Sequence, residues 1–162
     1  MMAPRSIFAA ILAGGIVGGT LDLLFAITFA GYNGIAPMRL LQTIASGVLG
    51  NGAYSGGGPA AALGLACHYG ISFAWAALFA ALAVRAPGLA RRPVPSGLAF
   101  GIAVFLGMRL VVLPLSAYPH PVGFRPLATL LDGLSHMLLF GLPIAWIVGR
   151  AVRGGAHAGA RA

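Results

Sequence analysis

Five ionisable side chains interrupt the apolar segments of this chain, and their types suit a buried charge or proton site. Both aspartates of the sequence, Asp22 and Asp132, lie inside such segments, and Arg109 lies in another. His68 and His136 add two imidazoles, which can gain or lose a proton near neutral pH. Asp132 and His136 are four residues apart, so they share one face if their segment is helical.

Burying these groups in an apolar medium is costly. On membrane-insertion scales each central aspartate or arginine costs about 2.5–3.5 kcal/mol, so three unpaired groups cost on the order of 8–10 kcal/mol. Opposite charges at one depth offset part of that cost by pairing. We therefore expect a buried polar cluster in which Arg109 lies between Asp22 and Asp132.

Each of these residues also has a purely structural interpretation. Arg109 could extend to a nearby membrane interface, Asp132 could lie in that interface, and a neutral His68 could hydrogen-bond to a carbonyl. A salt-bridge network that only stabilises the protein is therefore an alternative to a site that handles protons. His68 and His136 could instead bind a haem iron or another metal ion, and no other cofactor is expected.

Catalytic motifs are missing from the sequence. It contains no GxSxG, HExxH or phosphate-binding loop. Ser135 and His136 are adjacent and project in different directions, so they do not form a catalytic dyad. The single cysteine, Cys67, excludes an internal disulfide bond. We expect no catalytic residues and no enzyme activity.

Four long apolar segments carry the ionisable residues. The chain is 59% hydrophobic and 7% charged, whereas a soluble domain has about 25% charged residues. A membrane-spanning helix needs about 20 mostly apolar residues, and four segments qualify: 7–30, 60–83, 97–115 and 127–149. We expect an all-α membrane protein, an antiparallel four-helix transmembrane bundle that forms one domain over 1–153. A disordered tail is expected over 154–162.

The link between the first two segments contains a shorter amphipathic stretch over 38–50. Its apolar residues share one helical face, and Gly50 can end the helix: Leu40, Leu41, Ile44 and Val48. The stretch is too short to span, so we expect an additional interfacial or re-entrant helix on the outer side, with Arg39 and Gln42 in it. A glycine-rich turn over 52–59 follows, and the proline-rich link over 116–126 is expected to be extended.

Arginine placement predicts the orientation. Seven arginines flank the two ends and the middle link: Arg5, Arg85, Arg91, Arg92, Arg150, Arg153 and Arg161. Arg39 and Arg125 lie in the other two links, so both termini are expected in the cytoplasm of a bacterial inner membrane. Orientation explains the net charge of +8, and no nucleic acid is expected as a partner. With 1.5 Å of rise per residue, all five ionisable residues fall about 7–14 Å below the outer boundary.

Small residues at a spacing of four allow helix backbones to approach closely in lipid. The pairs are Gly14 with Gly18, Gly15 with Gly19, and Gly97 with Gly101. They could pack the helices of one chain together. Alternatively, the four glycines of the first segment could form the contact of a homo-oligomer.

The functional hypotheses follow from the polar cluster. The leading one is a transporter or channel-like component that uses the cluster for protons or a small solute. The second is a non-catalytic scaffold or partner subunit, in which the cluster only holds the bundle together. The third is a haem- or metal-binding membrane protein.

Several stretches resemble a family of small bacterial inner-membrane proteins of unknown function, usually described as conserved hypothetical proteins. They are residues 39–47, Gly56 with Gly57, His68, residues 111–117, His136 and residues 141–144, within a match that extends over 14–150. The resemblance implies a bacterial origin and four spans, and it implies no activity. Members of that family carry an uncharged polar residue near the position of Arg109, so its role is expected to be particular to this sequence.

Overall fold

The computed structural model describes the backbone of residues 4–159 and the side chains of residues 7–154. Four of its helices are long and apolar enough to cross a membrane, by length and composition: Ile7–Tyr32, Gly57–Arg85, Pro93–Leu115 and Pro126–Gly154. They occupy the four segments predicted from sequence. The last helix continues to Gly159, so residues 154–159 are helical where the start of a disordered tail was predicted. The rest of that predicted tail lies outside the described residues.

The four long helices contain eight elements and are joined by three connections. The first two long helices are α1 (Pro4–Tyr32) and α3 (Gly57–Arg85). The third comprises α5 (Pro93–Gly107), η2 (Met108–Val112) and α6 (Leu113–Leu115). The fourth comprises α7 (Pro126–Ser135), η3 (His136–Gly141) and α8 (Leu142–Gly159). Between them lie α2 (Pro37–Leu49), the 3₁₀ helix η1 (Gly50–Ser55), α4 (Pro87–Arg91) and the loop over 116–125.

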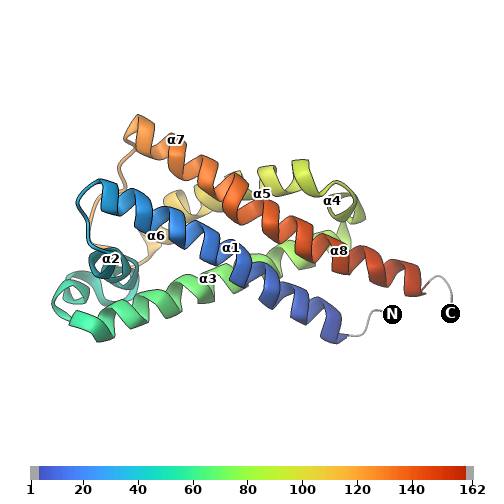
Figure 1. The fold of residues 1–162 in the computed structure, drawn as a ribbon, viewed down its shortest axis with the longest axis horizontal. Coiled ribbons are helices and arrows are strands. Elements are labelled where there is room, and N and C mark those ends of the chain that lie inside the picture. Colours follow the sequence, from blue (N-terminus) through green and yellow to red (C-terminus); the bar gives the residue numbers. More distant parts are fainter. Residues whose placement is uncertain (1–3, 160–162) are drawn as a thin grey trace.

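Successive long helices run in opposite directions (Figure 1). The start of α1 and the last turns of α8 lie at the same end of the molecule as α4, which we call the α4 end. The opposite end holds α2, η1 and the loop over 116–125, and we call it the α2 end. The arrangement is the antiparallel one that the sequence predicts.

Prolines begin several helices and change the course of two others. Pro37, Pro93 and Pro126 start α2, α5 and α7, where the missing N–H costs no hydrogen bond. Pro114 and Pro143 instead lie inside the third and fourth long helices. Since a proline ring clashes with the carbonyl four residues earlier, the helix before each one widens into a π-helical turn, η2 and η3. The N–H of the residue after each turn bonds to a carbonyl five residues back, Leu113 to Met108 and Leu142 to Met137.

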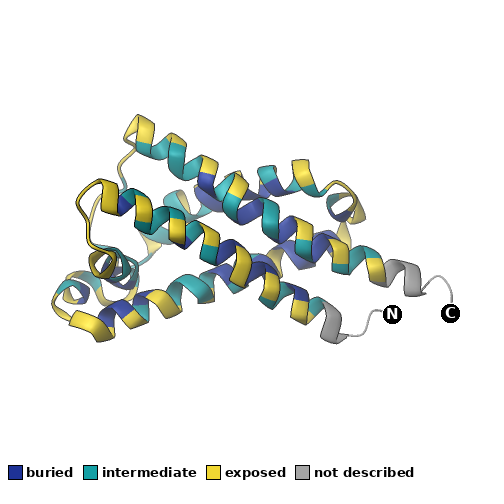
Figure 2. Cartoon of the chain, viewed as in Figure 1, coloured by how far each residue is buried: buried dark blue, intermediate teal, exposed yellow. Residues whose placement is uncertain are grey.

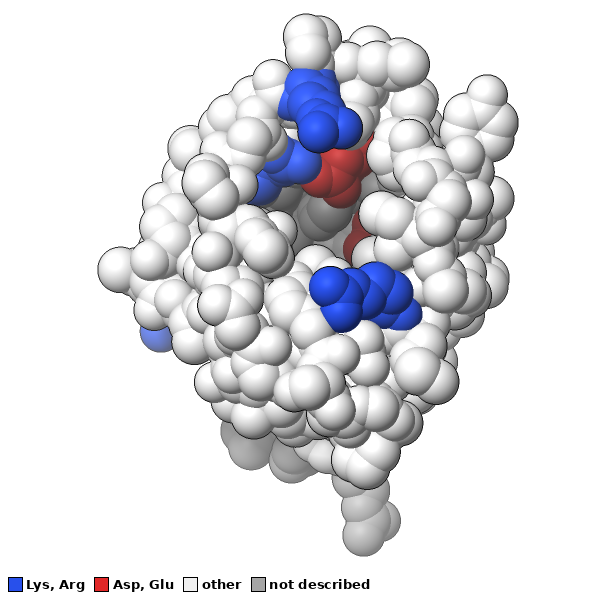
Figure 3. Space-filling model, turned by 90° about the vertical axis from the view of Figure 1, so that its left-hand side faces the viewer, with Lys and Arg blue, Asp and Glu red and all other residues white. Residues whose placement is uncertain are grey.

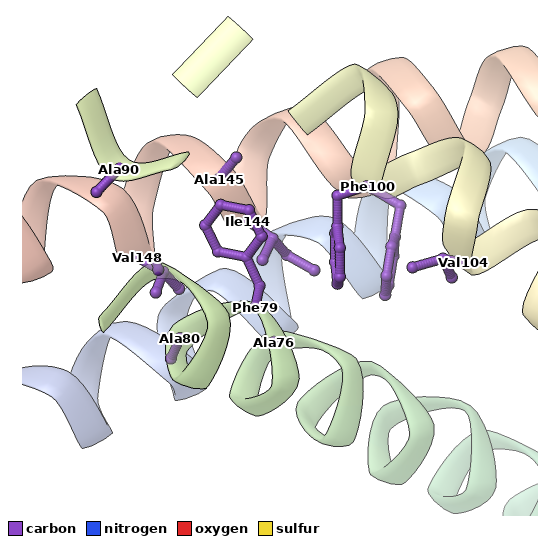
Figure 4. Close-up of a cluster of buried hydrophobic side chains, with 11 residues drawn as sticks. Ala76, Phe79, Ala80, Ala90, Phe100, Val104, Ile144, Ala145 and Val148 are labelled. Atoms are coloured by element: carbon purple, nitrogen blue, oxygen red, sulfur yellow. The ribbon is translucent and has the colours of Figure 1, made fainter. Parts of the chain in front are cut away.

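A packed apolar core lies toward the α4 end (Figure 4). The rings of Phe79 from α3 and Phe100 from α5 meet edge to face, with centroids 5.0 Å apart. Val104, Ile144 and Val148 pack around them and are 1% exposed or less. This core closes the space between the long helices at the α4 end.

Glycines on α1 and α5 let these helices approach their neighbours. Gly14 and Gly18 lie against Ile144 of α8, whereas Gly15 and Gly19 lie against Phe73 and Ser72 of α3. All four glycines are buried within the chain. A homo-oligomer contact through them would therefore require the bundle to open.

The outward faces of the long helices are apolar. Large apolar side chains are exposed on each of them, for example Leu24, Leu78, Leu106 and Leu138. Figure 2 shows the buried residues gathered where the helices cross, with exposed residues along the outer faces. A helix of a soluble bundle would carry polar side chains on such a face, so this surface suits a lipid environment.

At the α2 end the long helices diverge (Figure 1), and α2 lies across the opening. Its buried residues are Gln42, Ala45 and Ser46 rather than the predicted apolar face. The reason is a close crossing: Gly64 of α3 leaves room for the backbone of α2, where an added Cβ would meet the carbonyl of Leu41. The N–H of Ala117 in the loop over 116–125 donates to the carbonyl of Gly47, at 2.9 Å. Helix α2 and this loop therefore form one cover over the opening.

Candidate functional site

Arg109 and Asp132 form an ion pair between the third and fourth long helices. The Nε and Nη2 atoms of Arg109 both donate to Oδ2 of Asp132, at 3.3 and 3.2 Å. Nη1 donates to the carbonyl of Gly123 in the loop, and the guanidinium lies near the rings of Phe105 and Phe124. The arginine side chain is 19% exposed and the aspartate 34%. All three guanidinium nitrogens thus have acceptors, and the pair keeps contact with solvent.

His136 lies between the two aspartates. Its Nδ1 is 2.9 Å from the carbonyl oxygen of Asp132 and 3.3 Å from Oδ1 of the same residue. The same nitrogen is 3.7 Å from Oδ1 of Asp22 on α1, which also accepts a hydrogen bond from the hydroxyl of Ser135 at 3.0 Å. Because a carbonyl only accepts, Nδ1 carries a proton in this arrangement. Its Nε2 has no hydrogen-bond partner among the described residues.

The predicted order of the cluster is therefore changed. Arg109 was expected between the two aspartates, but it pairs with Asp132 alone, and His136 provides the connection to Asp22. Asp132 and His136 lie four residues apart on the fourth long helix. Arg109 of η2 contacts Asp132 of this pair. The order along the network is Arg109, Asp132, His136 and Asp22.

His68 is separate from this network. Its Nε2 hydrogen-bonds to the carbonyl of Gly19, at 2.8 Å, which is the structural role considered for it from sequence. The hydroxyl of Ser72 donates to the carbonyl of His68, and the ring lies edge-on to Tyr69. The bond to Gly19 ties α3 to α1 one helical turn from Asp22.

A cavity of about 560 Å³, cavity 1, lies at the inner side of the network. Asp22, His68 and His136 line it together with Ser72, and most of its remaining wall is apolar. Ile44 and Val48 of α2 close part of it, so the apolar face of α2 borders this cavity. Its volume and lining are typical of sites that bind small molecules.

A second cavity of about 730 Å³, cavity 2, lies on the other side of the network, between α1 and α7. Arg109 and Asp132 line it, as do Phe25 and Phe29 of α1. The ion pair and His136 therefore stand between two cavities, with Arg109 and Asp132 on one side and Asp22 and His136 on the other. Figure 3 shows the α2 end, where acidic and basic side chains gather around a hollow in the surface.

Aromatic and basic side chains surround the opening at the α2 end. The guanidinium of Arg39 stacks over the ring of Tyr54, 3.8 Å from its centroid, and the hydroxyl of Tyr54 is 3.1 Å from Nε2 of His120. His120 lies edge-on to Tyr118, which lines cavity 1. Burial raises the pKa of the Tyr118 phenol, Tyr54 acts in the same direction and Arg109 opposes them. The phenol therefore stays protonated at neutral pH and can donate a hydrogen bond.

Gln42, the other polar residue expected in the outer helix, is buried and donates from Nε2 to the carbonyl of Gly57, at 3.2 Å. This bond and the Arg39–Tyr54 contact tie α2 to the turn that follows it. Neither residue lines cavity 1. Both therefore position the cover and do not form the binding surface.

Known proteins give no further guide. No family model matches the chain, and no curated protein or solved structure is similar to it. The resemblance to a family of small inner-membrane proteins stays a prediction. Within the described residues, no three His, Cys, Asp or Glu side chains group as ligands for one metal ion. Each of the two histidines considered as haem or metal ligands uses one ring nitrogen to bond to a backbone carbonyl. Nε2 of His68 bonds to Gly19, and Nδ1 of His136 bonds to Asp132.

Ser135 is the residue of this site that sequence reasoning missed. Its hydroxyl donates to Oδ1 of Asp22 and contacts the carbonyl of Asp132. The signal was present in the spacing, because Asp132, Ser135 and His136 stand at positions i, i+3 and i+4 of one helix. Cys67, the single cysteine, lines cavity 1 and is partly buried.

Proposed function

We propose that the protein is a multi-pass component of a bacterial inner membrane that couples movement of a small solute to protons. Both termini and α4 then lie in the cytoplasm, and the α2 end faces outward with α2 at the interface. The four long apolar helices, their apolar outer faces and the arginines near the α4 end support this placement. Cavity 1 is the solute chamber, and the network of Arg109, Asp132, His136 and Asp22 is the proton-accepting group.

The observation that carries the proposal is the position of the network. It contains an imidazole with a free Nε2 between two carboxylates, and it separates two cavities. A network that only stabilised the bundle would have no need of a 560 Å³ cavity beside its most buried carboxylate. Ionisable groups that face a cavity inside a membrane protein commonly mark ion or proton pathways.

Access to the site is one-sided, which suits a transport cycle. Cavities open toward the α2 end, whereas the Phe79–Phe100 core closes the α4 end. For a solute to pass, the cover formed by α2 and the loop over 116–125 must open to admit it, and the core must then open while the cover is closed. Protonation of His136 alters its attraction to Asp22 and Asp132, and it thereby changes the coupling between α1 and the fourth long helix.

The test is uphill uptake by proteoliposomes. Purified protein is reconstituted at an inner pH of 5 or 8 and exposed to outside pH values from 5 to 8, with a panel of small labelled solutes, so that proton gradients of both directions are tested. Accumulation of a solute that depends on the pH gradient, and that is lost in His136→Ala and Asp22→Asn, supports the proposal. The Cys67→Ala variant serves as a matched control within cavity 1. Uptake equal to that of empty liposomes for every solute would favour a scaffold role.

A further inference from the structure

The charges of the network do not balance unless one more positive charge is present. Asp22 and Asp132 carry one negative charge each, and Arg109 carries one permanent positive charge. With neutral His136 the four side chains therefore sum to one negative charge. With protonated His136 they sum to zero. Since a buried uncompensated charge is unfavourable, the site requires either one further proton, for which His136 offers a free Nε2, or another cation.

The uncompensated charge lies on Asp22. Arg109 donates two hydrogen bonds to Asp132, whereas Asp22 receives one neutral hydroxyl bond from Ser135. His136 Nδ1 is 3.7 Å from Asp22 Oδ1, beyond hydrogen-bond distance. The Asp22 side chain is only 13% exposed, so protein covers most of its surface.

Cavity 1 is suited to the missing cation. Asp22 is the only charged carboxylate among its lining residues, and no arginine or lysine lines it. Aromatic rings of Trp75, Tyr118 and Phe140 form part of its wall, and aromatic faces attract organic cations. A cavity with one acidic group and apolar walls selects a ligand that carries one positive charge and apolar substituents.

We propose, on the basis of the proposed function, that cavity 1 binds a monovalent organic cation with apolar groups and that this cation exchanges with one proton on His136. Nδ1–H stays bonded to the Asp132 carbonyl, so the exchanged proton is the one on Nε2. When the cation enters, the Nε2–H bond breaks, its electron pair stays on nitrogen and the proton leaves to water in the cavity. One positive charge replaces another, and the network stays neutral.

Other titratable and charged groups around His136 have defined places in this exchange. Asp132 of α7 is held by Arg109 of η2, and Asp22 of α1 faces the cation. His68 of α3 and Tyr118 of the loop line the same cavity. Nε2 of His68 donates to a carbonyl. A substitution of His68 therefore tests whether the released proton comes from His68 or from His136.

The experiment compares two probe ions of similar shape and opposite charge, tetraphenylphosphonium and tetraphenylborate. Binding to the purified protein in detergent is measured by equilibrium dialysis against micelles alone, between pH 5 and 8. In weak buffer, tetraphenylphosphonium should release about one proton for each ion bound. In the pH range where His136 is protonated in the free protein, the affinity for the cation should increase by up to about tenfold for each unit by which the pH is raised. Tetraphenylborate should show no saturable binding. Equal binding of the two ions, or cation binding without proton release, would overturn the inference.

Variants locate the effect. Asp22→Asn should lose cation binding, and Asp22→Glu should keep it, which excludes a general folding defect. His136→Gln should bind the cation without releasing a proton, because the network then always carries one negative charge. His68→Gln should still release about one proton for each cation bound, whatever its affinity. Arg125→Leu, at a residue that does not line cavity 1, should match the wild type in affinity and in proton release. Proton release that disappears in His68→Gln and persists in His136→Gln would contradict the assignment.

The outcome is separable from that of the proposed function. Cation binding with proton release but no uphill uptake by proteoliposomes would leave the cation site standing and reject transport. Proton-driven uptake of a neutral or anionic solute, with no binding of tetraphenylphosphonium, would leave transport standing and reject the cation site.

Discussion

His136 is the residue through which the two aspartates are connected, and Arg109 holds the outer one of them. Removal of either partner leaves a charge in a site with restricted access to water. The cost of an unpaired charge grows with burial, so Asp22, at 13% exposed, is more sensitive than Asp132, at 34%. Loss of a partner of Asp22 is therefore expected to destabilise the protein more than loss of the Arg109 partner of Asp132.

At this scale we predict the effect of Arg109→Leu. Asp132 loses two hydrogen bonds and its permanent counter-charge, which should destabilise the protein by about 1–3 kcal/mol, less than for a fully buried pair because Asp132 keeps contact with water. The double variant Arg109→Leu/Asp132→Leu should recover part of the loss. Thermal unfolding in detergent, followed by helical circular dichroism, measures both.

Arg125→Leu is the matched control, because Arg125 is exposed and its side chain has no hydrogen bond or ion pair among the described residues. It should change stability by less than about 0.5 kcal/mol. An Arg109→Leu protein as stable as this control would mean that Arg109 extends into solvent and does not support Asp132.

Much of the site was predictable from residue types. Asp22, Arg109, Asp132 and His136 were expected in one cluster because all lie at one depth, and the structure joins them. The order of partners was not predictable, because depth along a helix does not determine which side chains face one another around the bundle. Thus Arg109 was assigned to both aspartates, and Ser135 was missed.

The helical elements place these residues through prolines and glycines. Pro143 widens η3, the turn that begins with His136, and Pro114 follows η2, which carries Arg109. Gly97 and Gly101 of α5 lie against the backbone of η3 and α8, where no side chain would fit. The position of His136 therefore depends on a close contact between two backbones.

We predict that Gly101→Ala disturbs the site from the next helix. An added Cβ would lie 2.5 Å from Cα of Met137 and 2.7 Å from the carbonyl carbon of His136. Because backbone atoms cannot rotate away, η3 must shift, at a cost of at least about 1–3 kcal/mol. The midpoint of thermal unfolding should fall, and proton release on cation binding should weaken with it.

Gly31→Ala in α1 is the control for this change, since nothing lies within 4 Å of an added Cβ there. Alanine has the higher helix propensity, so stability should be unchanged or rise by up to about 1 kcal/mol. Equal effects of the two substitutions would show that the α5–η3 contact is looser than the structure has it.

Element positions were largely predictable, since long apolar runs determine the four helices and Gly50 ends α2. The π-helical turns were not predicted. A membrane span is apolar over its whole length, so one extra residue in a turn does not change its hydrophobic pattern. The two internal prolines were the available signal. Which face of α2 packs against the bundle was not predicted, because the sequence does not show the close crossing at Gly64 that buries Gln42, Ala45 and Ser46.

Across the whole molecule, the arginines of the connecting segments lie at the two ends of the bundle. Arg85, Arg91 and Arg92 lie in or beside α4, whereas Arg39 and Arg125 lie at the α2 end. Arg5 and Arg161, which the orientation argument also used, lie outside the residues whose side chains are described. This distribution supports the proposed orientation, in which the α4 end lies in the cytoplasm and the α2 end faces outward.

Single cysteines in a Cys67→Ala background test this orientation. Ser55→Cys at the α2 end and Ala86→Cys at the α4 end both replace exposed residues. In intact cells a membrane-impermeant maleimide should label Ser55→Cys only, and Ala86→Cys should react after the membrane is permeabilised. The reverse pattern would place the α2 end in the cytoplasm.

The most direct measurement of the role of the network is proton entry into liposomes that hold the protein and a trapped pH-sensitive dye. After the outside medium is acidified, with potassium and valinomycin to hold the membrane potential at zero, wild-type liposomes should acidify faster than empty ones when a transported solute is present on both sides of the membrane. His136→Gln and Asp22→Asn should acidify at the rate of empty liposomes, and Cys67→Ala at the wild-type rate. Wild-type liposomes that acidify no faster than empty ones, or His136→Gln liposomes that match the wild type, would show that the network carries no protons and only holds the helices together.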